Sequence, residues 1–152
     1  MKLAIGCDEA AYNLKVLIMK HLDKKEGMEY VDFGAVEGDE VLYPDIAYKV
    51  ASEIAAGRYE RGLLFCGTGI GMAICANKVP GIRAAVCHDP FSAERSRKSN
   101  DAQIMCMGER VIGGELAKYI LDIWLGCDFA GGSSLSKVNR INELEHKFAK
   151  KF

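Results

Sequence analysis

Short apolar runs alternate with longer segments of helical periodicity along the whole chain. Each run is too short for a helix and predicts a strand. The predicted strands cover residues 2–7, 29–34, 61–66, 82–87 and 103–107. Between the strands, apolar residues recur every three or four positions, which predicts helices. The predicted helices cover residues 11–25, 43–56, 70–77, 90–98, 113–125 and 133–150.

This alternation is typical of a parallel sheet that helices cover on both faces. The sequence therefore predicts an α/β fold, a Rossmann-like three-layer α/β/α sandwich with a five-stranded parallel sheet. No internal repeat, low-complexity tract or linker interrupts the chain, so residues 1–152 are interpreted as a single domain. Ser133 and Ser134 are suitable caps for the last helix.

The third predicted strand ends in a segment that is suited to chemistry. Cys66 is followed by the alternating glycines Gly67, Gly69 and Gly71. Glycine removes side chains where backbone N–H groups could turn towards an anion, and open parallel sheets bind ligands at the carboxyl ends of their strands. The alternative is a tight turn in which Cys66 only packs, because free cysteine is often buried.

The glycine pattern does not fit a nucleotide site. Met72 stands where the dinucleotide-binding pattern has its third glycine, and the Gly-Lys-Ser/Thr of a P-loop is absent from the sequence. The ends of the other predicted strands also carry polar residues, and parallel strands bring these ends to one edge of the sheet. These residues are Asp8, His88, Asp89, Glu109 and Arg110.

Composition narrows the range of partners. The 152 residues include 20 basic and 21 acidic side chains, for a net charge of −1, so no overall field attracts nucleic acid or an anionic membrane. No stretch approaches the ~20 apolar residues of a membrane span. Six cysteines lie scattered in apolar segments without a Cys-x-x-Cys pair. We therefore expect a cytoplasmic protein with reduced thiols and with neither nucleic acid nor membrane as a partner.

Six motifs together carry a resemblance to a known family. They are Gly6-Cys7-Asp8, Tyr43-Pro44, Cys66 to Gly71, Ala76 to Arg83, Ser99-Asn100-Asp101 and Gly108 to Gly113. Over nearly its whole length the chain resembles the type B ribose-5-phosphate isomerases, a family that includes galactose-6-phosphate isomerase subunits. The resemblance implies interconversion of aldose and ketose phosphates through a cis-enediol, without a cofactor or a metal. It also implies a homodimer or tetramer with shared active sites, in which the C-terminal helix of about 133–150 contacts a neighbouring subunit.

The resemblance also implies roles for individual residues. Cys66 would be the base that removes the carbon-bound proton, and the Thr68 hydroxyl with nearby loop N–H groups would stabilise the oxyanion. A free thiol has a pKa of about 8.5, so such a base needs activation by loop amides and by the helix N-terminus behind it. Asp8 would exchange protons with the sugar oxygens, or would only cap a turn. Tyr43 would contact the substrate, or would only pack.

Three departures from the typical ribose enzymes of this family matter. Glu9 stands where they have a histidine, and Ser99 stands where they have the histidine that opens the sugar ring. Ser133 and Lys137 occupy the positions of two arginines that bind phosphate in those enzymes. The phosphate site of this chain must therefore use other cations.

The candidate phosphate ligands are Lys137, Arg110 and Arg140. Arg140 is equally compatible with a solvated charge on a helix. Glu9 would repel a phosphate, so it would hold a substrate hydroxyl or pair with one of these cations. Asn100 would complete the pocket of a neighbouring subunit.

The missing ring-opening histidine bears on the substrate. Ribose 5-phosphate is mostly a furanose that must open before proton abstraction, whereas a four-carbon sugar 4-phosphate cannot form that ring. Ser99 and Glu9 therefore resemble the branch of the family that interconverts erythrulose 4-phosphate and erythrose 4-phosphate. His88 would open the ring of a cyclic substrate, or would only begin a helix.

The sequence thus predicts an aldose/ketose isomerase that acts on ribose 5-phosphate or on a tetrose 4-phosphate. The alternative is a catalytically silent sugar-phosphate-binding subunit of a heteromeric isomerase. The presence of both Cys66 and Asp8 favours the enzyme.

Overall fold

Five parallel strands form one sheet in the computed structural model, which describes residues 1–149. Every neighbouring pair of strands is parallel, and the strand order is β2-β1-β3-β5-β4. The predicted sandwich with a five-stranded parallel sheet is confirmed. The strands are β1 (Lys2–Cys7), β2 (Glu29–Asp32), β3 (Arg61–Cys66), β4 (Ala84–Val86) and β5 (Ile104–Gly108).

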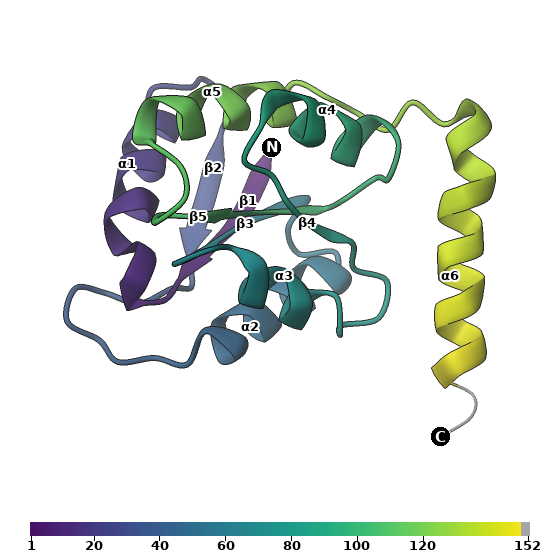
Figure 1. Cartoon of the computed structure of the whole chain (residues 1–152), viewed down its shortest axis with the longest axis horizontal. Helices are drawn as coiled ribbons and strands as arrows, with labels where there is room; N and C mark the ends of the chain where they lie inside the picture. The colour runs from purple at the N-terminus through teal and green to yellow at the C-terminus, as the bar shows by residue number, and fades with distance from the viewer. Residues whose placement is uncertain (150–152) are drawn as a thin grey trace.

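Helices cover both faces of this sheet (Figure 1). α1, α4 and α5 lie on one face, and α2 and α3 lie on the other. Two short 3-10 turns, η1 (Glu9–Ala11) and η2 (Gly132–Ser134), precede α1 and α6. The helices are α1 (Tyr12–Leu22), α2 (Tyr43–Ala55), α3 (Ile70–Ala76), α4 (Pro90–Lys98), α5 (Gly114–Leu125) and α6 (Leu135–Ala149).

Side chains alternate between the two faces of each strand and so build two separate cores. Leu63 and Phe65 of β3 belong to the core with α1 and α5, whereas Leu64 and Cys66 belong to the core with α2 and α3. All residues of β3 are buried, as expected for a central strand of a parallel sheet. Cys66 therefore ends a strand that is packed on both faces.

The strand predicted at 82–87 is shorter in the structure. The N–H of Ile82 closes a turn onto the carbonyl of Val79, and the N–H of Arg83 donates to the side chain of Gln103 at 2.8 Å. Because these backbone groups find partners outside the sheet ladder, the strand begins only after them.

The remaining boundaries shift by three residues or fewer. The last helix begins at Leu135 rather than at the predicted residue 133, because Ser133 and Ser134 belong to η2, and Ser134 directly precedes the first residue of α6. Lys150, the predicted end of the last helix, lies outside the described residues. None of the helices within residues 1–149 has the length and apolar character that crossing a membrane requires.

The fold opens a crevice between β1 and β3. The loop after β1 leads to α1 on one face of the sheet, and the loop after β3 leads to α3 on the other. Adjacent strands whose loops leave to opposite faces create the crevice in which α/β sheets bind ligands. Asp8 follows β1 and Cys66 ends β3, so the crevice lies between these two residues.

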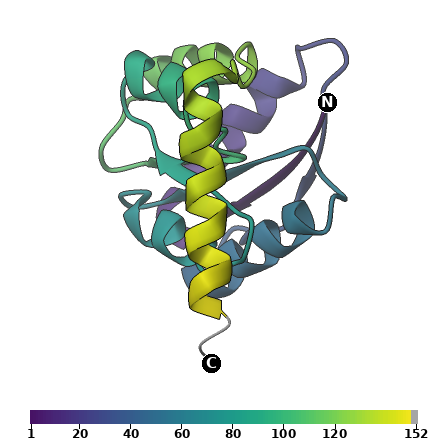
Figure 2. The same cartoon turned by 90° about the vertical axis from the view of Figure 1, so that its right-hand side faces the viewer.

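α6 lies beside the three layers rather than within them (Figures 1 and 2). Val138 is buried, Asn142 accepts a hydrogen bond from Arg83 at 3.3 Å, and Glu145 accepts one from the N–H of Gly81 at 2.8 Å. These three residues of α6 share one face of the helix. The rest of the α6 surface is mostly exposed.

Candidate active site

Cys66 sits where β3 gives way to the glycine loop, with 6% of its surface exposed. The N–H of Gly69 donates to its Sγ at 3.1 Å. Position 69 requires glycine, because its φ is 77° and a Cβ there would lie 2.9 Å from the carbonyl carbon of Met107. A thiolate accepts such a hydrogen bond more strongly than a thiol does. The loop therefore gives Cys66 surroundings that suit a base.

The glycine loop is fixed against the carboxyl end of β5. The N–H groups of Glu109 and Arg110 donate to the carbonyls of Cys66 and Gly67 at 3.0 and 3.1 Å. Gly108 permits this approach, because a Cβ there would lie 2.5 Å from the loop backbone. The loop conformation is thus held by main-chain contacts rather than by its own side chains.

Thr68 and Tyr43 form part of the wall of the site. Thr68 is exposed, and its Oγ1 accepts a hydrogen bond from the N–H of Ile70 at 3.3 Å. The hydroxyl proton of Thr68 remains available for a ligand. The Tyr43 ring lies against Gly71, where a Cβ would come within 2.7 Å of the ring carbons. The absence of a side chain at Gly71 therefore allows the Tyr43 ring to lie against the start of α3.

Asp8 places a buried carboxyl group beside the glycine loop. Its surface is 8% exposed, and Oδ1 accepts a hydrogen bond from the N–H of Ala10 at 3.1 Å, so the capping interpretation of Asp8 is correct for this oxygen. Burial raises the pKa of Asp8 and the neighbouring Glu9 raises it further, whereas the hydrogen bond from the Ala10 N–H and, less strongly, the charge of Arg110 oppose the shift. The Asp8 carboxyl group therefore holds its proton more strongly here than a carboxyl group in water does.

These groups converge on an open cleft of about 570 Å³, a size typical of small-molecule sites. The Arg110 side chain lies over Gly67. Within residues 1–149, Arg110 makes no ion pair, so its guanidinium is available to an anion. The cleft is lined by Asp8, Glu9, Ala10, Tyr43, Cys66, Gly67, Thr68, Ile70, Gly71, Ile74 and Arg110.

Three of the lining residues were not expected from the sequence. Ile70 and Ile74 lie one helical turn apart on α3 and are 55% and 59% exposed, and Ala10 belongs to η1. The signal was weak, because the i, i+4 spacing of the two isoleucines reads as a buried helix face. Their exposure at the rim of the cleft becomes apparent only in the fold.

His88 does not line the cleft. Its Nε2 accepts a hydrogen bond from the N–H of Gly108 at 2.8 Å, which requires an unprotonated Nε2. Burial lowers the pKa of His88, with a small opposing effect of Asp89. His88 therefore joins the segment after β4 to the end of β5.

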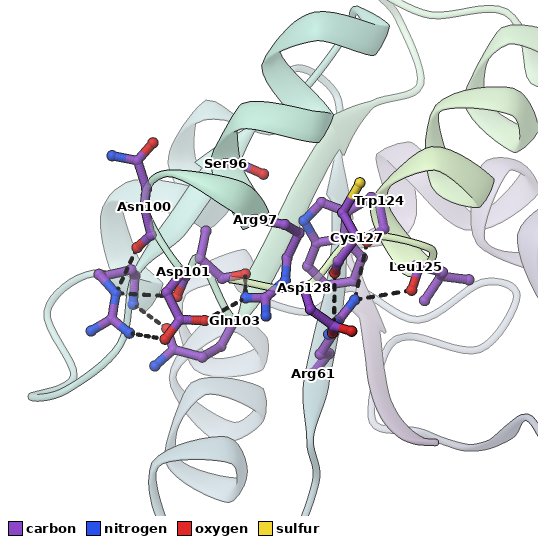
Figure 3. Close-up of polar contacts among 12 residues, drawn as sticks. Arg61, Ser96, Arg97, Asn100, Asp101, Gln103, Trp124, Leu125, Cys127 and Asp128 are labelled. Carbon is purple, nitrogen blue, oxygen red and sulfur yellow. Dashed lines mark hydrogen bonds and ion pairs between the residues drawn. The ribbon is translucent and has the colours of Figure 1, made fainter. Parts of the chain in front are cut away.

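Ser99 and Asn100 follow α4, away from the cleft of their own chain. The Arg95 guanidinium donates to Ser99 Oγ. Asp101 has a φ of 48° and pairs with Arg83 at 3.2 Å and with Arg97 at 3.0 Å. Figure 3 shows the Asn100 side chain pointing away from this cluster. The ion pairs thus hold a bend that turns Asn100 outwards.

The cluster in Figure 3 continues to Trp124 of α5. Trp124 is fully buried, and the guanidinium groups of Arg61 and Arg97 lie 5.3 and 6.0 Å from the centre of its ring. Arg61 also donates to the carbonyls of Trp124, Leu125 and Cys127 at 2.9 to 3.2 Å. The end of α5 and the bend at Asp101 are therefore joined through one set of arginines.

Lys137 and Arg140 are exposed on α6 and do not line the cleft of their own chain. Arg140 pairs with Glu143 at 2.9 Å, whereas Lys137 makes no ion pair within residues 1–149. Ile141 and Leu144 follow Lys137 at i+4 and i+7 and are 45% and 49% exposed. Lys137 thus heads an exposed apolar stripe on α6.

Comparison with known proteins assigns the family. The pattern described as Ribose/Galactose Isomerase matches residues 3–141. The chain belongs to the ribose/galactose isomerase family. The predicted resemblance is thereby confirmed, including its tetrose-phosphate branch, which is represented among the relatives.

Members of the ribose/galactose isomerase family match this chain over nearly their whole length. A ribose-5-P isomerase B of Listeria innocua is 56% identical over 147 residues, which is 97% of this chain and 99% of that protein. A D-erythrulose-4-phosphate isomerase of Pectobacterium atrosepticum is 51% identical over 148 residues, which is 97% of each. The structure of Clostridium thermocellum ribose-5-phosphate isomerase B superimposes with a TM-score of 0.94 at 48% identity, over 97% of this chain and 99% of that chain. This chain is accordingly an enzyme of the isomerase class.

Proposed function

We propose that this protein interconverts an aldose phosphate and a ketose phosphate without a cofactor. One observation carries the proposal: a thiol that accepts a backbone hydrogen bond faces the same cleft as a buried carboxyl group and an unpaired arginine. Carbonyl migration between C1 and C2 needs a base, a group that moves protons between two oxygens, and an anchor for the phosphate. Cys66, Asp8 and Arg110 supply these three functions in the proposal.

The steps balance with Cys66 starting as thiolate and Asp8 as acid. The thiolate removes the proton from C2 of the aldose, and the electrons of the C2–H bond form the C1–C2 double bond. The π electrons of the C1 carbonyl move onto O1, which Asp8 protonates. Asp8, now a carboxylate, takes the proton from the O2 hydroxyl while the C2 carbonyl forms. The electrons of the C1–C2 double bond then form a new C–H bond at C1 with the proton from Cys66, which is again a thiolate. The Thr68 hydroxyl and loop N–H groups stabilise the enediolate, each such donor being worth about 3–4 kcal/mol.

Phosphate binding is assigned to Arg110 and to cations of a second subunit. Lys137 is the better of the two candidates on α6, because Arg140 is already paired with Glu143. Glu9 is exposed in the cleft next to Asp8, a position from which it would bind a substrate hydroxyl rather than the phosphate.

The site requires a homodimer or a larger assembly in this proposal. Ser99, Asn100 and Lys137 lie away from their own cleft, and the stripe of Ile141 and Leu144 leaves an apolar surface exposed on α6. Docking α6 on a neighbouring copy would cover this surface and bring Lys137 towards the neighbour's cleft. Sedimentation should give a dimer or tetramer, and a monodisperse active monomer would refute the assembly.

Subunit complementation tests the shared site directly. Cys66→Ala and Asn100→Ala chains should each be inactive alone, yet a reassociated mixture should regain about a quarter of the wild-type activity, because about half of the dimers are mixed and each carries one intact site. A mixture without any gain in activity contradicts the contribution of Asn100 to a neighbour.

The preferred substrate is a tetrose 4-phosphate. Ser99 has no pKa near neutrality, so it is a poor group for opening a furanose, and general acid/base assistance is typically worth about 10²- to 10⁴-fold. Erythrulose 4-phosphate, which is acyclic, avoids this step, and the relative in Pectobacterium atrosepticum carries the name of that activity. The alternative is ribose 5-phosphate, as named for the relative in Listeria innocua.

A panel of four-, five- and six-carbon sugar phosphates decides between these substrates. We expect a higher kcat/KM for erythrulose 4-phosphate than for ribose 5-phosphate, and Ser99→His should narrow the gap. A preference for ribose 5-phosphate that is lost in His88→Ala would overturn the tetrose assignment and give ring opening to His88.

Cys66→Ala tests the base. The folded variant should lose exchange of the substrate's C2 proton with solvent, and near-normal isomerisation would show that the base lies elsewhere. Turnover by the purified wild-type chain alone excludes the remaining alternative, a silent sugar-phosphate-binding subunit.

A further inference from the structure

Helix α1 has no cap of its own. Its N-cap residue, Ala11, has no side-chain hydrogen bond, and the first turn of a helix leaves N–H groups that need an acceptor. The carboxylate of Glu109, 95 positions after Leu14 in the sequence, supplies this acceptor. Glu109 Oε2 accepts a hydrogen bond from the N–H of Leu14 at 2.8 Å, and Oε1 accepts one from the Asn13 side chain at 3.4 Å.

The backbone of Glu109 is bonded to β3, on the side of the cleft that carries Cys66. Its N–H donates to the carbonyl of Cys66 at 3.0 Å. One residue therefore bonds through its main chain to the strand that carries the thiol and through its side chain to the helix that follows Asp8. The N–H of Asp8 donates to the carbonyl of Phe65 at 3.3 Å, which fixes the Asp8 backbone on β3. The Asp8 carboxyl group is oriented from η1, because the N–H of Ala10 donates to its Oδ1 at 3.1 Å. η1 leads directly into α1, so the anchoring of α1 on Glu109 bears on the orientation of the Asp8 carboxyl group.

We infer that Glu109 is a positioning residue that fixes the Asp8 carboxyl group relative to the Cys66 thiol. This inference rests on the proposed function, because it concerns the same two reacting groups. Glu109 does not line the cleft, so it acts through Asp8 and not on the substrate. A displacement of about 1 Å in a reacting group is enough to lower a rate by about 10²-fold.

The test compares Glu109→Ala with Glu109→Gln. The alanine variant should lose about 10²-fold in kcat with KM changed by less than about 3-fold, because it moves a reacting group and leaves Arg110 in the cleft. The glutamine variant keeps an oxygen acceptor for the N–H of Leu14 and should stay within about 5-fold of wild type. Glu115→Ala, which removes an exposed carboxylate from the first turn of α5, is the matched control and should leave kcat unchanged.

Two further readouts separate positioning from a general loss of structure. Hydrogen exchange at the Leu14 amide should be faster in Glu109→Ala and close to wild type in Glu109→Gln. In an Asp8→Asn background, Glu109→Ala should cost less than about 3-fold, because the group that it positions is already disabled. If Glu109→Ala does not fold, Glu109→Ser, whose side chain is too short to reach Leu14, replaces it.

Three outcomes would overturn the inference. They are a Glu109→Ala kcat within about 3-fold of wild type, an undiminished loss in the Asp8→Asn background, and a Glu109→Gln variant as impaired as the alanine variant. Failure of the proposed function gives a different result. The wild-type chain would then turn over no sugar phosphate, while hydrogen exchange at the Leu14 amide would still be faster in Glu109→Ala than in the wild type.

Discussion

A single methyl group at Gly71 tests whether Tyr43 contacts the substrate. In Gly71→Ala the new Cβ would lie 2.7 Å from the Tyr43 ring, about 0.7 Å short of the 3.4 Å at which ordinary contact begins. Tyr43 is 41% exposed at the start of α2, so the ring can retreat by this distance. The backbone of the site stays in place, and only the phenol group moves.

The magnitudes separate an effect on activity from one on stability. Crowding costs about 1–3 kcal/mol in a full core, whereas replacing glycine by alanine within a helix returns about 0.5–1 kcal/mol. Because the exposed Tyr43 ring can move away, the crowding cost should lie near its lower limit and the net cost should stay below about 1 kcal/mol, which corresponds to a fall in Tm of no more than about 4 °C. Loss of one hydrogen bond of about 0.5–1.5 kcal/mol to the substrate lowers kcat/KM by roughly 2- to 10-fold.

Steady-state kinetics with thermal unfolding provide the assay. Tyr43→Phe should show the same loss as Gly71→Ala, and the double variant should lose no more than either. Gly113→Ala is the matched control, because a Cβ there meets nothing within 4 Å. The reasoning fails if Gly71→Ala keeps full kcat/KM, or if Tyr43→Phe is unaffected while Gly71→Ala is impaired.

Two further predictions concern stability. His88→Ala leaves the buried N–H of Gly108 without its acceptor and should cost about 1–3 kcal/mol of unfolding free energy at pH 7. Burial lowers the pKa of His88, so as the pH falls the unfolded chain binds a proton at this histidine before the folded chain does. The unfolding free energy of the wild type should therefore decrease below about pH 6.5. Urea unfolding at pH 7.5 and 5.5 should show a smaller decrease in His88→Ala, and an equal decrease would contradict this. Asp101→Asn should lose about 1.5–3 kcal/mol through its pairs with Arg83 and Arg97, and Asp101→Ala should lose more, because asparagine tolerates the φ of 48° and alanine does not; calorimetry that ranks them equally would remove the backbone argument.

The fold was predictable because its signal is local. A run such as Leu63 to Phe65 is apolar at every position, which indicates a strand buried on both faces, and the helices between the runs repeat every three or four residues. The strand order β2-β1-β3-β5-β4 is not local. It depends on which strands pair across the chain, and no spacing in the sequence encodes that choice.

The candidate site was predictable only in part, for the same reason. Cys66 and its glycines are consecutive, so a strand followed by a turn already suggests them. The sequence identifies Glu109 only as a polar residue at the end of a strand, because its partner Leu14 is 95 positions away. The surroundings of His88 were equally hidden, since its acceptor role depends on β4 and β5 lying side by side.

The single tryptophan of the chain has a consequence for spectroscopy. Trp124 is fully buried between the end of α5 and the arginines that hold the Asp101 bend, and it does not line the cleft. Its fluorescence should therefore report on the bend that presents Asn100 and remain insensitive to ligand in the same chain's cleft. Unfolding can therefore be followed both by Trp124 fluorescence and by activity. The two curves will differ under conditions in which the Asp101 bend unfolds before β3, which carries Cys66.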